Sequence, residues 1–85
     1  MAMRSPSPAA RIVRNPRVLG GEPIVEGTRV PVRSIVLVSR YAPDLDYVCR
    51  AFALPPQAIQ AALQYYEENR AEIDRHIADN ESDDS

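Results

Sequence analysis

The stretch from residue 18 to residue 32 constrains the fold most, because it holds all three glycines of the chain and two of its eight prolines. Glycine reaches positive φ without steric cost, whereas proline fixes φ and removes an N–H donor. Within the stretch, the β-prone runs Ile24-Val25 and Thr28-Arg29-Val30 flank the turn dipeptide Glu26-Gly27. This order predicts a tight β-hairpin.

A short β-prone segment precedes the hairpin. It runs from Arg11 to Arg14 and is stopped by Asn15-Pro16. A strand this short is marginal alone, so we expect it to pair with the hairpin. The sequence therefore predicts a β-strand and hairpin segment over residues 11–32. Residues 1–10 have no periodicity and are predicted to be a disordered N-terminus.

After the hairpin, the apolar residues change to the spacing of a helix. Val32, Ile35 and Val36 fall at i, i+3 and i+4, which predicts a first helix over about residues 32–42. Residues 35–38 are all apolar and rich in β-branched side chains, so a buried strand is the competing interpretation.

Two further helices follow, each preceded by proline. Pro43 ends the first helix, and Asp44 is placed to cap the second. The apolar stripe of this second helix comprises Leu45, Val48, Cys49 and Phe52. Cys49 in such a stripe is interpreted as a buried apolar residue rather than a reactive thiol.

The third helix begins after the double proline at 55–56, because proline suits the first turn of a helix. Its inward-facing residues are predicted to be Ile59, Ala62, Leu63 and Tyr66. The same stripe continues through Ile73 and Ile77, so the helix is predicted to extend to about residue 78. The fold is thus expected to be mainly α: a three-helix helix-turn-helix domain over residues 33–78 with a short N-terminal β-strand and β-hairpin, and an acidic disordered tail over residues 79–85.

The charges are segregated along the chain of 85 residues. Residues 1–50 carry eight arginines and four acids, a balance of +4, and residues 51–85 carry two arginines and eight acids, a balance of −6. A basic front and an acidic back indicate two surfaces with two kinds of partner.

The lone cysteine excludes an intramolecular disulfide and suits a reducing cytoplasm. No apolar run is long enough to span a membrane, and the N-terminus lacks a signal peptide, so the protein is expected to be cytoplasmic. A single core of this size rarely supplies more than about 3–5 kcal/mol, which predicts a homodimer formed through the first strand and the hairpin.

Three groups of residues resemble the domain-of-unknown-function 433 family. They are Arg11-Ile12 with Asn15-Pro16, then Gly20-Gly21-x-Pro23, and then Gly27-Thr28-Arg29-x-Pro31-Val32. The resemblance covers roughly residues 11–70. It implies a small helix-turn-helix protein that acts as the antitoxin of a type II toxin–antitoxin pair, often with a PIN-like nuclease as toxin. The chain departs from the family at Pro55, where Ser or Thr usually caps the helix.

The third helix is the candidate recognition helix. Gln57, Gln60 and Gln64 lie opposite its apolar stripe, and glutamine can pair bidentately with adenine in the major groove. An ordinary solvated helix face is the competing interpretation. Candidate phosphate contacts flanking this helix are Arg29, Arg33, Arg40 and Arg50. Binding of operator DNA and autoregulation of the operon are therefore expected in addition to toxin binding, although the pI near 5.3 is low for a DNA-binding domain.

The toxin is expected to lie against the end of the third helix and the tail, through Glu67, Glu72, Ile73, Ile77 and Asp79. The alternative function is a protein-interaction module or scaffold that does not bind DNA. Catalysis is not expected, because His76 is the only histidine and has no nucleophile at a recognisable spacing. No cofactor or metal site is predicted either.

Overall fold

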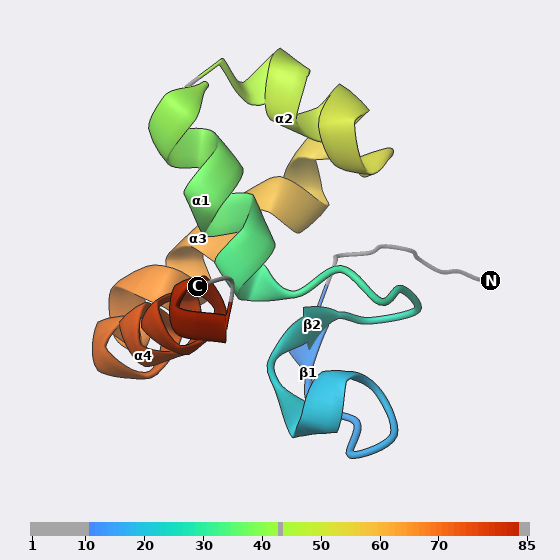
Figure 1. The fold of residues 1–85 in the computed structure, drawn as a ribbon. Coiled ribbons are helices and arrows are strands. Elements are labelled where there is room, and N and C mark those ends of the chain that lie inside the picture. The colour runs from blue at the N-terminus through green and yellow to red at the C-terminus, as the bar shows by residue number, and fades with distance from the viewer. Residues whose placement is uncertain (1–10, 43, 84–85) are drawn as a thin grey trace, which may run out of the picture.

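A computed structural model describes residues 11–42 and 44–83, and within this part the side chains are described up to residue 80. The predicted N-terminal tail, residues 1–10, lies outside the described residues. Four helices pack together, and a two-stranded antiparallel sheet lies beside them (Figure 1). The prediction of a mainly α fold with an N-terminal strand and hairpin is confirmed.

The sheet joins the first strand to the hairpin, as predicted. Strand β1 (Ile12–Val13) runs antiparallel to β2 (Ile24–Val25), with Ile12 opposite Val25. Between them lies a short turn of 3₁₀ type, η1 (Leu19–Gly21), whose three residues all have positive φ. Gly20 and Gly21 adopt this conformation at no steric cost, whereas Leu19, at φ 51°, does not.

The predicted hairpin is present, but its second arm is not a regular strand. The Thr28 N–H donates to the Val25 carbonyl, and the Val25 N–H donates to the Val30 carbonyl, each at 3.0 Å. An isolated bridge joins Ile24 to Pro31, and beyond it the Val32 N–H donates to the Pro23 carbonyl at 3.0 Å. Val32 is already the first residue of the first helix, so the second arm ends there.

The first three helices match the predicted ones closely. They are α1 (Val32–Tyr41), α2 (Leu45–Phe52) and α3 (Pro56–Glu68). Residues 35–38 are helical, so the strand interpretation is wrong. Asp44 caps α2 as predicted, its Oδ1 accepting a hydrogen bond from the Asp46 N–H at 3.1 Å.

The prediction of one continuous C-terminal helix is wrong, because α3 ends at Glu68 and a separate helix, α4 (Arg70–Asp83), follows. The break lies at Asn69, whose Nδ2 donates to the Tyr65 carbonyl at 3.0 Å and whose N–H donates to the Tyr66 carbonyl. An asparagine that bonds to the preceding turn competes with the helix ladder. Residues 79–83 of the predicted disordered tail are therefore helical, and residues 84–85 lie outside the described part.

The core forms around α1, which packs against α2, α3 and α4. Val32, Ile35 and Val36 of α1 are buried together with Val48 of α2 and Ile59 of α3. The break at Asn69 lets α4 turn back, so that Ile73 and Ile77 join this core. No helix among the described residues is long and apolar enough to cross a membrane.

Candidate nucleic-acid interface

A three-residue turn joins α2 to α3 and gives the two helices their relative position. Ala53 adopts the left-handed conformation, at φ 56° and ψ 45°. Its N–H donates to the Arg50 carbonyl, and the Leu54 N–H donates to the Cys49 carbonyl at 3.0 Å. These two bonds form the Schellman motif that commonly ends a helix. A short turn of this kind between two packed helices is typical of a helix-turn-helix unit.

Helix α3 begins without a side-chain cap, because Pro55 occupies the capping position. The Pro55 carbonyl still accepts hydrogen bonds from the N–H groups of Ala58 and Ile59. Pro56 at the first helical position has no N–H to satisfy, which reduces the cost of the missing cap. Although Pro55 replaces the usual Ser or Thr cap, α3 still begins at Pro56, where the proline pattern predicts it.

The three predicted glutamines lie along the exposed side of α3. Gln57, Gln60 and Gln64 are all exposed, while Ile59 on the opposite side is fully buried. Gln64 Nε2 donates to Glu68 Oε2 at 3.4 Å, so this third glutamine already has an acidic partner. Gln57 and Gln60 lie nearer the N-terminal end of the helix, which is the end that reaches base edges in helix-turn-helix proteins.

The four predicted phosphate contacts have different surroundings. Arg50 is exposed and its Nη1 lies 3.2 Å from Asp46 Oδ2 on the same helix. Arg29 is exposed and has no carboxylate partner among the described residues. Arg33 is mostly buried, and its Nε lies 2.6 Å from Glu22 Oε1. Neither atom has a well-aligned hydrogen bond within the described part, so the contact is an ion pair without directed hydrogen bonding. Arg40 Nη2 lies 3.4 Å from Asp74 Oδ1, and both side chains are about half exposed.

The residues predicted to bind a partner are not all available on the surface. Ile73 is fully buried and Ile77 nearly so, because both pack in the core of this chain. Glu67 pairs with Arg70 at 2.7 Å. Asp79 is exposed. Glu72 belongs to a polar cluster that connects α4 to the N-terminal segment.

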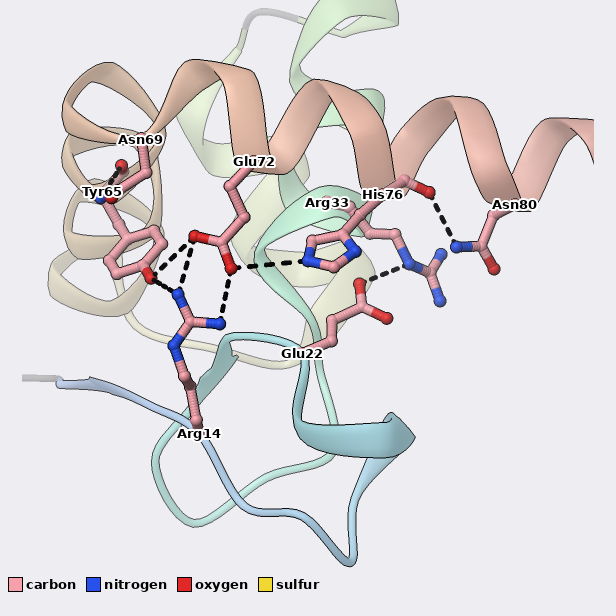
Figure 2. A network of polar contacts seen from close by, with 8 residues as sticks. All are labelled: Arg14, Glu22, Arg33, Tyr65, Asn69, Glu72, His76 and Asn80. Atoms are coloured by element: carbon pink, nitrogen blue, oxygen red, sulfur yellow. Dashed lines mark hydrogen bonds and ion pairs between the residues drawn. The ribbon is translucent and has the colours of Figure 1, made fainter.

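This polar cluster comprises Glu72 and His76 of α4, Tyr65 of α3, and Arg14 of the segment after β1 (Figure 2). Arg14 Nη2 donates to Glu72 Oε1 at 2.7 Å and to the Tyr65 hydroxyl at 2.6 Å. His76 Nε2 lies 3.5 Å from Glu72 Oε2. Arg14 thus joins the segment after β1 to two helices that are more than fifty residues away in sequence.

Contacts within the cluster shift the pKa values of three of its members. The hydrogen bond from Arg14 holds the pKa of Glu72 below its usual value, against the opposing effect of burial. The same bond raises the pKa of Arg14, and burial raises the pKa of Tyr65. Sequence reasoning missed this cluster. The spacing of Glu72 and His76 at i, i+4 was visible, but nothing in the sequence connected them to Arg14.

The surface has two kinds of hollow near these groups. A polar hollow of about 510 Å³ lies between η1 and α4, where Glu22, Glu72, Arg75 and His76 line it. An apolar groove runs along α1, α2 and α3, and its two parts have volumes of about 420 and 250 Å³. Both parts of the groove share Ser39 and Leu63. The remaining lining residues of the groove are Val36, Arg40, Leu45, Val48, Ile59, Gln60, Tyr66 and Glu67.

Within residues 11–42 and 44–83, no three His, Cys, Asp or Glu side chains are grouped so that they could hold a metal ion. Cys49 is a partly buried free thiol that packs against the core. The surface offers several groups suited to binding: exposed amides on α3, a free guanidinium on the hairpin and an apolar groove.

Comparison with known proteins identifies the family of this fold. The family model described as "Protein of unknown function (DUF433)" matches residues 12–66. The chain belongs to the DUF433 family. The matched region runs from β1 into the last turn of α3, so it contains the hairpin and the helix-turn-helix unit, while α4 lies outside it.

A solved structure supports the assignment to the DUF433 family. A crystal structure of a DUF433 member protein from Anabaena variabilis is similar to this chain, with 37% sequence identity and a TM-score of 0.69. The similarity covers 79% of this chain and 67% of that one. No curated protein is matched.

Proposed function

We propose that this DUF433 protein is the antitoxin of a type II toxin–antitoxin pair and that it binds operator DNA through α3. The observation that carries the DNA-binding part is the α2–turn–α3 unit, in which the core packs one side of α3 and leaves Gln57, Gln60 and Gln64 exposed on the other. The antitoxin role is carried over from the family resemblance of the sequence.

Two glutamines are proposed to read bases, and one arginine to contact the backbone. Gln57 and Gln60 have no competing side-chain partner in the described part of the chain, and bidentate pairing of an amide with adenine contributes about 1–3 kcal/mol of discrimination. Arg29 supplies a free positive charge. Arg33 is excluded from the proposed interface by its buried pair with Glu22, and Arg40 reaches DNA only by exchanging Asp74 for a phosphate.

Fluorescence anisotropy with the chain's own upstream region tests DNA binding. The wild-type protein should bind this duplex more tightly than a scrambled duplex of equal length. Gln60→Ala should reduce that preference about tenfold. Gln64→Ala is the matched control on the same helix face, and its effect should be smaller because Gln64 already pairs with Glu68. Equal binding to both duplexes would contradict base reading.

Toxin binding is best tested at Asp79, the exposed acid of the predicted partner surface. Deleting residues 70–85 would remove Ile73 and Ile77 from the core, so loss of binding after truncation would not distinguish contact from unfolding. Asp79→Lys should instead weaken co-purification of the neighbouring PIN-like nuclease without unfolding the chain. Asp46→Lys on α2 is the control, since Asp46 is also an exposed acid. Equal effects of the two variants would exclude α4 as the toxin surface.

The alternative, a protein-interaction module that does not bind DNA, is favoured by the apolar groove along α1, α2 and α3. Leu45 lines this groove, and Leu45, Tyr41 at the end of α1 and Tyr47 on α2 are large exposed hydrophobic residues. A groove lined by such a residue suits an amphipathic helix of a partner. Toxin neutralisation in cells together with no DNA binding at low salt would select this alternative.

A further inference from the structure

The tip of the hairpin holds one arginine in a closely bonded turn. Gly27 has a φ of +82°, and the turn closes when the Thr28 N–H donates to the Val25 carbonyl at 3.0 Å. The Thr28 hydroxyl adds two more bonds: Oγ1 donates to the Val25 carbonyl at 2.8 Å and accepts from the Val30 N–H at 3.0 Å. Residues on both sides of Arg29 are therefore fixed.

The hairpin is also anchored to the rest of the molecule. Val25 is buried, and the Val32 N–H at the start of α1 donates to the Pro23 carbonyl at 3.0 Å. In Figure 1 the segment between β2 and α1 projects outward on the side away from α4. The tip is thus a short, braced arm on the side opposite the acid-rich helix.

Arg29 is the charge on this arm that remains unneutralised. Glu26 lies 3.9 Å from Arg11, and Glu22 pairs with Arg33. Each acid of the segment from residue 22 to residue 33 thus has its own arginine, and Arg29 has no carboxylate partner in the described part of the chain. A ligand that matches this site is an anion with oxygen atoms that the planar guanidinium fork can bind, which is the geometry of a phosphate.

We infer that the hairpin tip is a rigid arm that sets Arg29 against a backbone phosphate of bound DNA, with Thr28 as its positioning residue. This inference rests on the proposed function, which already assigns Arg29 to the DNA backbone, and it adds that the bonded turn and the Thr28 hydroxyl position this contact. Holding the backbone of the arginine in place before binding reduces the entropy lost when the contact forms. The hydroxyl of Thr28 therefore contributes to affinity without touching the DNA.

Anisotropy titrations of the full chain over a series of salt concentrations test the inference. Arg29→Gln should weaken binding about tenfold at low salt and reduce the slope of log K against log salt by about 0.9, the value for one lost phosphate contact. Arg29→Lys keeps the charge and should keep the slope, while losing part of the affinity together with the planar fork. Arg17→Gln is the matched control, because Arg17 is also exposed, unpaired among the described residues and located in a turn.

Thr28 is tested by two variants. One replaces the threonine hydroxyl by a methyl group, and the other keeps the hydroxyl and removes the methyl group. Thr28→Val should weaken DNA binding several-fold without changing the salt slope, and amide exchange at Val30 should become faster because its acceptor is lost. Thr28→Ser keeps the hydroxyl and should retain the affinity. Circular dichroism confirms that each variant is folded.

The outcomes separate this inference from the proposed function. If wild-type protein binds DNA but Arg29→Gln and Arg17→Gln lose affinity equally, the arm is not a specific contact and the inference is overturned. If Thr28→Val binds as tightly as wild type, the positioning role is wrong. If wild-type protein does not bind DNA at all, the DNA-binding function fails and this inference fails with it.

Discussion

Two neighbouring sides of α4 make contacts of opposite character. One side buries Ile73 and Ile77 against α1, and the adjacent side presents Glu72 to Arg14 and carries His76 next to Glu72. Burying an isoleucine side chain contributes about 1.5–3 kcal/mol, whereas a partly exposed ion pair contributes about 0–1 kcal/mol. The apolar side therefore holds α4 in place, and the polar side orients the N-terminal segment at little gain in stability.

The largest expected effect comes from the apolar side. Ile73→Ala should lower the free energy of unfolding by about 2–5 kcal/mol, because the side chain is fully buried and a cavity would remain. Urea denaturation followed by circular dichroism measures the change. A loss below about 1 kcal/mol would show that α4 does not pack on α1 in solution.

On the polar side, Glu72→Gln should lower the free energy of unfolding by about 0.5–1 kcal/mol at pH 7, since it removes the charged acceptor of Arg14. The loss is small because the Arg14 side chain is half exposed to solvent. The same denaturation experiment checks it, with Arg14→Gln as the partner variant. If the double variant loses as much as the two single variants together, the pair does not interact.

The difference between wild type and Glu72→Gln should depend on pH. Arg14 lowers the pKa of Glu72 in the folded state from 4.5, so the stability that this carboxylate contributes is complete above about pH 5. It is lost as the pH falls through the lower pKa of the folded state. Melting temperatures of the two proteins should therefore converge in acid. A constant difference from pH 7 to pH 3 would contradict the assignment.

A smaller change, this time a gain in stability, is expected from the turn between α2 and α3, which is separate from α4. Ala53→Gly should raise the free energy of unfolding by about 0.5–1 kcal/mol, because alanine is strained at positive φ and glycine is not. Thermal denaturation measures the shift. A lower melting temperature would indicate that Ala53 does not adopt the left-handed conformation.

The smallest effect is expected for the surface pair of Glu67 and Arg70. Glu67→Gln should change the free energy of unfolding by less than about 0.5 kcal/mol, because both side chains are well exposed to solvent. The same denaturation series measures it. This variant calibrates the polar side of α4, since a comparable loss in Glu72→Gln would mean that the Arg14 cluster adds no more than an ordinary surface pair.

The local patterns of the sequence predicted the N-terminal strand, the hairpin and the first three helices. Proline positions, the Asp44 cap and the apolar spacing act on residues that are close in sequence. The hydrogen bond from the Asp46 N–H to Asp44 is an example. The break at Asn69 was not predicted, because the apolar stripe continues through it with helical spacing. Tertiary packing decides the outcome there, since Ile73 and Ile77 reach α1 only when the chain turns back.

The candidate site was predictable only in part, for the same reason. The exposure of Gln57 and Gln60 follows from the helical period and the burial of Ile59. The pairing of Arg33 with Glu22 and of Arg40 with Asp74 was not predictable, because it depends on how distant elements meet. Part of the charge segregation seen along the sequence is neutralised within the chain, where Arg14 and Arg40 of the first half contact Glu72 and Asp74 of the second.

The position of Ile73 and Ile77 in the core has a consequence for the order in which the chain is made. Synthesis proceeds from the N-terminus, so these two residues are among the last of the core to leave the ribosome. Until they emerge, the face of α1 that they cover stays exposed to solvent. A product that stops at Asn69 would leave that apolar face uncovered permanently, so α4 determines whether this surface of α1 is apolar and exposed or part of the core.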